Sequence, residues 1–203
     1  MKSLITALAV TFLLGTFADA QQRQIQLKVG DVDLGRFEVD TQKTPIFEAG
    51  GVKDKNVPNP RDWLEIEIEF TVDGPADAVV PELQFRFYAG FKDQNGQGRT
   101  LTGDVRYKNV VCGEQYFATR YVSPNTLGEI TGDFRRFQAN AVEAAGVEVY
   151  YNGVIVGGES TMSGSSAKFW EVTGTTPGLL SKDKTPFALL WIDRYPDIAN
   201  DGR

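Results

Sequence analysis

Three glutamates alternate with apolar residues along RDWLEIEIEF, residues 61–70. They are Glu65, Glu67 and Glu69, called here the glutamate row. Alternation with a period of two is typical of a β-strand, and it places all three carboxylates on one face of that strand. Two carboxyl groups held near each other can serve as acid and nucleophile in the hydrolysis of a glycosidic bond. One hypothesis is therefore a carbohydrate-cleaving site.

The same stretch resembles the Glu-x-Asp-x-Glu signature of the laminarinase and lichenase type of glycoside hydrolase, a β-jelly-roll family. The resemblance implies that Glu65 is the nucleophile and Glu69 the acid/base. The middle acid here is Glu67 instead of aspartate, and the resemblance covers only residues 61–70. On an extended strand the Cα atoms of Glu65 and Glu69 lie ~13 Å apart, whereas retaining hydrolysis needs carboxyl groups ~5.5 Å apart.

The alternative interpretation is that the glutamate row is the hydrated outer face of a strand in a protein without a catalytic residue. Neighbouring strands would then neutralise the row with the basic side chains of Arg86, Arg106 and Lys108. The two hypotheses predict different surroundings. The catalytic one, which extends to a lectin, requires the acids at the floor of a groove lined by Trp63, Trp170 or Trp191.

Residues 1–20 have the order of features found in an export signal. A basic Lys2 precedes an apolar run over residues 4–17, and Ala18 and Ala20 form the small-residue pattern at which signal peptidase cleaves. The run is shorter than the roughly 20 apolar residues of a transmembrane helix. We expect cleavage after Ala20 and an exported mature chain, residues 21–203, that forms a single domain without a membrane span.

Charge and composition exclude several classes of function. The net charge is −6 and the chain has no basic run, so it lacks the positive surface on which nucleic-acid binding depends. It has no histidine, which removes the usual catalytic triads and the commonest zinc ligand. Cys112 is the only cysteine and follows two valines, so we expect a buried small side chain and no intramolecular disulfide.

The remaining short motifs predict neither a cofactor nor a metal ion. Residues 165–168 match S-x-x-K, but its companion motifs are missing. The glycines of residues 96–98 lack the third glycine of a dinucleotide fingerprint, and residues 93–96 lack the glutamate of a calcium loop. All three segments are predicted to be turns.

Period-two alternation recurs along the mature chain, with turn residues between most of the alternating segments. Such a pattern predicts antiparallel strands with one buried face. We therefore expect an all-β fold, an antiparallel β-sandwich of about ten short strands. The expected strands are residues 25–29, 34–39, 64–72, 83–87, 103–111, 115–122, 147–151, 154–158, 168–173 and 187–193.

Two local structures are predicted between the strands. Asn152 and Gly153 favour a type I′ hairpin, which would pair Tyr151 with Val154, Tyr150 with Ile155 and Val149 with Val156. Tyr150 and Ile155 are then candidate binding residues, unless another segment of the domain covers them. Apolar residues at helical spacing predict one short amphipathic helix over residues 131–146, packed on the sandwich.

Over its whole length, most clearly in GDFRRFQANAVEAAGVEVYYNGVIVGG and PFALLWIDRYPDI, the chain resembles secreted immunoglobulin-like β-sandwich proteins encoded with type IV pilus genes in verrucomicrobial gut bacteria. The resemblance implies an immunoglobulin-like fold, a periplasmic, outer-membrane-associated or extracellular location, and protein partners in the cell envelope or pilus. The cysteine pair typical of immunoglobulin domains is missing. No pattern in the chain specifies an oligomeric state.

Overall fold

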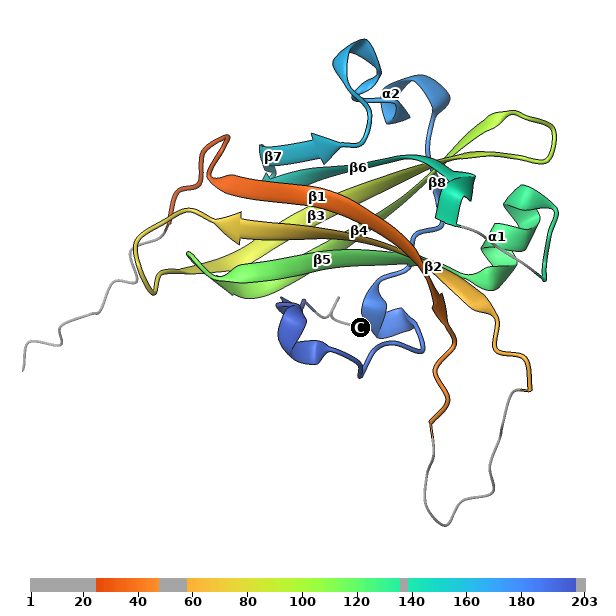
Figure 1. Cartoon of the computed structure of the whole chain (residues 1–203). Helices are drawn as coiled ribbons and strands as arrows, with labels where there is room; N and C mark the ends of the chain where they lie inside the picture. The colour runs from red at the N-terminus through yellow and green to blue at the C-terminus, as the bar shows by residue number, and fades with distance from the viewer. Residues whose placement is uncertain (1–24, 48–57, 136–138, 200–203) are drawn as a thin grey trace, which may run out of the picture.

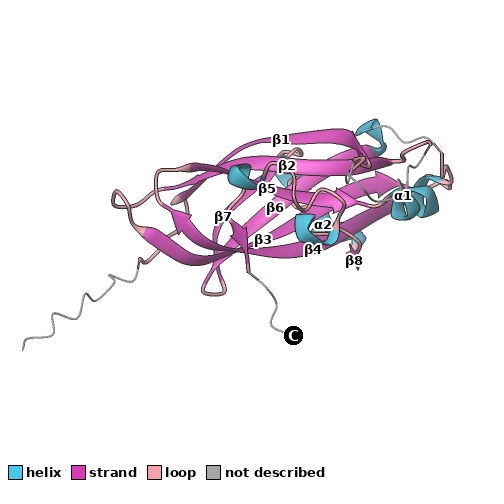
Figure 2. Ribbon diagram, turned by 90° about the horizontal axis from the view of Figure 1, so that it is seen from below, coloured by secondary structure: helices cyan, strands magenta, loops and turns pink. Residues whose placement is uncertain are grey.

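Two β-sheets lie face to face around an apolar interior (Figures 1 and 2). The computed structural model describes residues 25–47, 58–135 and 139–199. Sheet A has the order β1-β2-β5, formed by β1 (Val32–Lys43), β2 (Asp62–Val72) and β5 (Gln115–Val122). Sheet B has the order β7-β6-β3-β4-β8, formed by β3 (Val79–Lys92), β4 (Gly98–Val111), β6 (Val142–Tyr151), β7 (Val154–Ser160) and the two-residue β8 (Thr176–Pro177), with β9 (Asp197–Ile198) also paired to β4.

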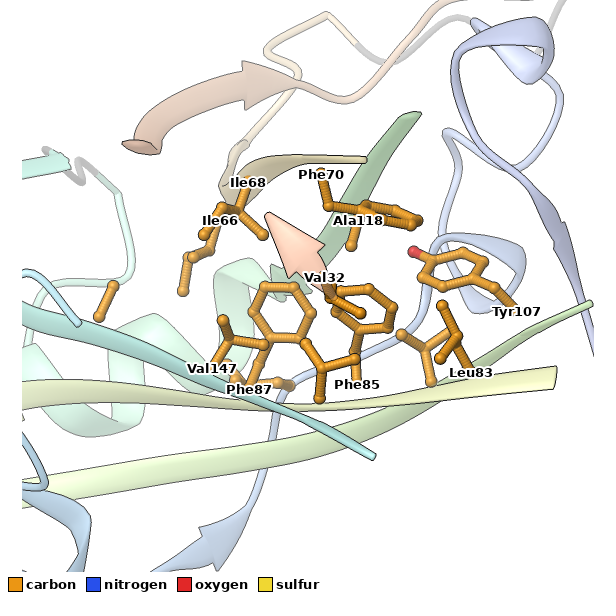
Figure 3. Close-up of a cluster of buried hydrophobic side chains, with 14 of the residues drawn as sticks. Val32, Ile66, Ile68, Phe70, Leu83, Phe85, Phe87, Tyr107, Ala118 and Val147 are labelled. Carbon is orange, nitrogen blue, oxygen red and sulfur yellow. The ribbon is translucent and has the colours of Figure 1, made fainter. Parts of the chain in front are cut away.

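The inward residues of the alternating segments form one core between the sheets. Ile66, Ile68 and Phe70 of β2 are fully or almost fully buried, and they face Phe85 and Phe87 of β3 (Figure 3). The rings of Phe70 and Phe85 lie 4.7 Å apart, centroid to centroid. The predicted β-sandwich is thus confirmed, and the period of two follows from burial of one strand face.

Seven of the predicted strands are confirmed, although most extend further than predicted because strand pairing continues beyond the alternating residues. Within the described residues the strands number nine, and β3 and β4 have 14 residues each, so the expectation of about ten short strands was only approximate. The confirmed segments are residues 34–39, 64–72, 83–87, 103–111, 115–122, 147–151 and 154–158, which lie within β1 to β7.

Three predicted strands were wrong. Residues 25–29 alternate but pair with no strand in the described part of the chain. Residues 168–173 instead contain the one-turn helix α2 (Trp170–Thr173), because the Trp170 ring stacks on Tyr88 at 4.2 Å, on the outer face of sheet B. Residues 187–193 form turns, and a left-handed backbone at Trp191, with φ of 51°, ends any extended run.

The predicted helix over residues 131–146 was also wrong. The eight-residue α1 (Pro124–Thr131) precedes it, and most of the C-terminal half of the predicted segment belongs to β6, where pairing with β3 overrides the helical spacing. Residues 136–138 lie outside the described part. The overlooked signal was Ser123 before Pro124, since Ser123 Oγ caps the helix by accepting the Thr126 N–H at 3.2 Å. The 3-10 turns are Ala139–Ala141, Gly164–Ser166, Lys182–Lys184 and Ile192–Arg194.

The β6–β7 hairpin was predicted correctly at its turn. Asn152 and Gly153 have φ values of 50° and 79°, the two positive angles that a type I′ turn requires. The pairs Tyr151–Val154 and Tyr150–Ile155 are present, but a register shift then places Val149 opposite Gly157 instead of Val156. The third predicted pair was therefore wrong, because an irregularity in the ladder follows the turn.

We expect Phe85→Ala to lower the free energy of unfolding by about 3–5 kcal/mol, because a fully buried ring in contact with other aromatic rings leaves a cavity. Urea denaturation measures the change. Val172→Ala is the control, because the Val172 side chain is exposed and its loss should change stability by about 0.5 kcal/mol or less. Equal effects of the two substitutions would contradict the assignment of the core.

Candidate acidic groove on sheet A

The glutamate row lies on the outer face of sheet A. In the β2–β5 ladder Glu65 is opposite Tyr121, whereas in the β1–β2 ladder Asp40 is opposite Glu65 and Glu38 is opposite Glu67. Acids therefore face acids across two strands, an arrangement that is unfavourable without a cation. The predicted neutralisation by Arg86, Arg106 and Lys108 was wrong, because these residues belong to β3 and β4 of sheet B.

A C-terminal segment covers part of this face, where Figure 1 shows the dark blue chain beside β5. We call residues 180–195 the C-terminal cover. Its Leu180 exchanges two backbone hydrogen bonds with Tyr121, of 2.8 and 2.9 Å, and its Phe187 ring stacks on the Tyr121 ring at 4.9 Å. Glu65 is only 8% exposed and Glu67 only 7%. The expectation of a hydrated row was therefore wrong for these two acids, while Glu69 is half-buried.

Both oxygens of the Glu65 carboxylate are hydrogen-bonded. The Tyr121 hydroxyl donates to Oε1, and Gln42 Nε2 of β1 donates to Oε2 at 3.0 Å. Burial raises the pKa of Glu65; the Tyr121 hydrogen bond opposes this shift, and the charge of Glu67 adds to it. Glu65 thus ionises at a higher pH than an ordinary glutamate.

Glu67 is held from the C-terminal cover. Arg194 Nη2 donates to Glu67 Oε1 at 2.6 Å, and the Tyr195 hydroxyl donates to Oε2. The Arg194 guanidinium also lies 3.5 Å from the centroid of the Phe117 ring on β5. These contacts attach the end of the C-terminal cover to the centre of sheet A.

A groove with a volume of about 230 Å³ remains between β1, β2 and the C-terminal cover. Acidic side chains from β1 and β2 form one part of its lining, and the C-terminal cover contributes the aromatic side chains. A neighbouring hollow contains Glu69, so the three glutamates do not converge in one site. The lining of this acidic groove is Glu38, Asp40, Gln42, Glu65, Glu67, Trp191, Arg194 and Tyr195.

The three tryptophans have different surroundings. Trp191 lines the acidic groove and is 50% exposed. Trp63 meets the Phe187 ring edge to face at 5.9 Å, and Trp170 lies on sheet B. Only Trp191 therefore has the position that the catalytic hypothesis required of a groove tryptophan.

Sequence reasoning missed most of the groove lining. The alternation of Glu38, Asp40 and Gln42 along β1 was a usable signal, because these side chains must share a face of the strand. Nothing in the sequence indicated that Arg194 and Tyr195 would reach β2, since the contacts join residues 127 and 128 positions apart.

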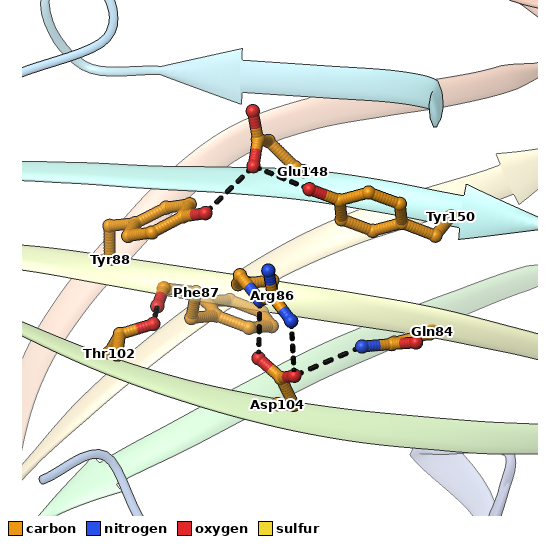
Figure 4. A network of polar contacts seen from close by, with 8 residues as sticks. All are labelled: Gln84, Arg86, Phe87, Tyr88, Thr102, Asp104, Glu148 and Tyr150. Carbon is orange, nitrogen blue, oxygen red and sulfur yellow. Dashed lines mark hydrogen bonds and ion pairs between the residues drawn. The ribbon is translucent and has the colours of Figure 1, made fainter. Parts of the chain in front are cut away.

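The two predicted binding residues, Tyr150 and Ile155, lie on sheet B. The Tyr150 hydroxyl donates to Glu148 at 2.8 Å, and Tyr88 donates to the same carboxylate oxygen at 2.7 Å (Figure 4). The Arg86 guanidinium lies 5.5 Å from the Tyr150 ring centroid. Tyr150 is thus half-buried in a polar network, whereas Ile155 is 39% exposed. Their role in binding stays a prediction.

Other predicted residues are placed as follows. Cys112 is buried, as predicted. Asp93 Oδ1 accepts the N–H groups of Asn95 and Gln97, both at 2.9 Å, and thereby closes the predicted turn. The predicted cleavage residues Ala18 and Ala20 lie outside the described residues.

In the described ranges, no group of acidic or cysteine side chains has the arrangement of a metal site, and no helix is long and apolar enough to cross a membrane.

Arg120 is a buried cation between the sheets, away from the acidic groove. It is opposite the core residue Ile66 in the β2–β5 ladder and is only 2% exposed. Among the described residues, its Nε and Nη2 atoms have no hydrogen-bond partner. Burial lowers the pKa of Arg120 to about 10, and the nearby Tyr107 and Asp104 partly oppose this shift. This charge is a cost to folding.

We expect Glu65→Gln to become more stable relative to the wild type as the pH rises from about 4 to about 8. The raised pKa of Glu65 means that the folded state binds this proton more tightly than the unfolded state, whose glutamate has a pKa near 4.3. The stability linked to the proton is present below that value and is lost as the pH rises through the folded pKa. Urea denaturation across this range measures it, with the exposed Glu129→Gln as control. A constant difference between Glu65→Gln and wild type would contradict the prediction.

Comparison with known proteins supplies a family for the chain. The curated proteins compared with it yield no match. The crystal structure of a protein from Akkermansia muciniphila, a verrucomicrobial gut bacterium, matches with a TM-score of 0.75 and 31% sequence identity, over 87% of this chain and 95% of that one. The resemblance to proteins of such bacteria is thereby confirmed. A protein-family model also matches residues 21–201. The chain therefore belongs to the family that this model describes.

Proposed function

We propose that the protein is an exported, non-enzymatic binding or assembly module, associated with the cell surface or with type IV pili. Family membership and the relative in Akkermansia muciniphila support this assignment, because they agree with the resemblance to secreted proteins encoded beside pilus genes. Residues 1–20 add the export signal, with cleavage after Ala20. Its partners are then proteins of the envelope or pilus.

The bonding of the two groove glutamates is the main observation in favour of binding over catalysis. All four carboxylate oxygens of Glu65 and Glu67 accept hydrogen bonds from Tyr121, Gln42, Arg194 or Tyr195. A nucleophile needs an oxygen that can approach the sugar carbon, and an acid/base needs one that can exchange a proton with the glycosidic oxygen or water. Side chains held from both sides suit a fixed binding surface better than either role.

A glycoside hydrolase or lectin is the second candidate. The half-exposed Trp191 beside Glu65 and Glu67 favours it, because an exposed aromatic ring beside polar groups is a common sugar-binding surface. Glu69, the acid/base implied by the resemblance to laminarinases, lies in the neighbouring hollow. This separation supports a lectin more than a hydrolase.

We expect the mature protein to release no reducing sugar from β-glucans such as laminarin and lichenan, because both oxygens of the candidate nucleophile Glu65 accept hydrogen bonds and the candidate acid/base Glu69 lies in the neighbouring hollow. A reducing-sugar assay compares wild type with Glu65→Gln. Sugar release by the wild type that is lost in Glu65→Gln would replace the proposed function with hydrolysis. Binding of the glucans without release, measured by affinity electrophoresis, would favour the lectin.

We expect N-terminal sequencing of the protein from its own cells to begin at Gln21, and antibodies to detect it on intact cells or on sheared pili. Ala18→Asp with Ala20→Asp should accumulate as an uncleaved precursor, because signal peptidase requires small residues at these positions. A protein that begins at Met1 and stays inside the cell would contradict both the export and the surface role.

A further inference from the structure

We propose that the free edge of β1 and the acidic groove beside it together dock an extended segment of a protein partner, with lysine or arginine at alternate positions. This inference deepens the proposed function and rests on it. It assigns a contact surface and a partner chemistry to the proposed module.

The first observation is that β1 is a long edge strand. It has 12 residues, and among the described residues it pairs with β2 alone. Its ladder is irregular only between Leu34 and Phe37, and from Phe37 to Lys43 the register is continuous. An edge strand carries backbone N–H and C=O groups that can pair with an added strand. β1 contains no proline, and its regular half has no bulge that would prevent such pairing. The Thr41 N–H donates to Asp40 Oδ1 at 2.7 Å, so Asp40 must release it when a partner strand pairs there.

The second observation is the charge on the outer side of this edge. Glu38 and Asp40 are exposed, face Glu67 and Glu65 across the ladder, and form no ion pair with any described residue. Among the described residues, Arg194 is the only cation in the groove lining; it is bonded to Glu67, and its charge also acts on Glu38 without forming an ion pair with it. A strand added to β1 would place its outward side chains ~5 Å from Glu38 and Asp40. Basic side chains there would relieve the opposition between the acids.

The third observation is the aromatic and apolar rim of the groove. Trp191 lines the groove and is half exposed, and beside it in the chain Leu189 and Ile192 are 79% and 60% exposed. An indole face is the strongest aromatic partner of an ammonium or guanidinium group. Exposed apolar side chains next to a charged groove are typical of a surface that binds another protein.

The charge pattern also decides which strand fits. A second copy of the chain, paired through β1, would bring a further Glu38 and Asp40 onto the same face and increase the repulsion. On the inner side of β1, the half-buried Phe37 and Val39 pack against the core. The partner segment therefore alternates basic residues outward with apolar or small residues inward.

The probe is a capped peptide of alternating lysine and threonine, titrated into the full mature protein near physiological salt. A peptide of the same composition with all lysines first, an alternating glutamate and threonine peptide, and spermidine serve as comparisons. We expect the alternating basic peptide to bind most tightly, to change the fluorescence of Trp191, and to slow hydrogen exchange of β1 amides. These three effects follow from ion pairing, contact with the indole and strand addition.

Variants distinguish binding at the acidic groove from attraction to the negative charge of the whole protein. Glu38→Gln with Asp40→Asn should weaken peptide binding about tenfold, the combined effect of two partly exposed ion pairs. Trp191→Phe removes the fluorescence response of the groove and should weaken binding less. Glu129→Gln with Glu159→Gln makes the same charge change at exposed positions outside the groove and should leave binding unchanged. All three variants alter exposed side chains, and circular dichroism verifies that they fold.

Three outcomes would overturn the inference: equal binding of the alternating and block peptides, equal loss in both double variants, or binding of spermidine as tight as that of the peptide. The last result would indicate a site for small polyamines. If the docking inference fails, the proposed function still stands, provided that the protein is found on the cell surface and does not cleave or bind glucans. Conversely, peptide binding by a protein retained inside the cell would contradict the proposed function alone.

Discussion

The hydrogen bonds that Glu65 and Glu67 accept are the interactions on which the outer face of sheet A depends. Tyr121 and Gln42 hold one carboxylate from the neighbouring strands, while Arg194 and Tyr195 hold the other from the C-terminal cover. A buried carboxylate without such donors is strongly unfavourable. The hydrogen bonds to Glu67 thus couple the burial of that acid to the attachment of the C-terminal cover, while Glu65 is held within sheet A.

This arrangement explains why β2 is buried on both sides although its sequence alternates. The inward Ile66 and Ile68 contact the core, and the outward Glu65 and Glu67 lie beneath a segment from the other end of the chain. Alternation normally indicates one wet face. Here the polar face is largely excluded from solvent because its charged side chains have partners, not because it is apolar.

The same attachment leaves the acidic groove incompletely neutralised. The C-terminal cover supplies Arg194 to Glu67 and places Trp191 at the groove, but Glu38 and Asp40 on the edge strand form no ion pair with a described residue. Negative charge next to an exposed aromatic ring attracts cations. The proposed binding role of this face rests on the unequal coverage of β1 and β2.

The amino-acid pattern was sufficient to predict the sandwich and most of its strands, because alternation such as Leu64, Ile66 and Ile68 records burial that is local to each strand. It also determined the hairpin turn, since Asn152 and Gly153 tolerate positive φ. Three features became apparent only from the folded chain: β6 is a strand in a segment with helical spacing, Arg86 and Lys108 lie on the sheet opposite the glutamates, and Arg194 reaches Glu67. These outcomes depend on which distant segments meet, and alternation within a strand carries no information about its neighbours in space.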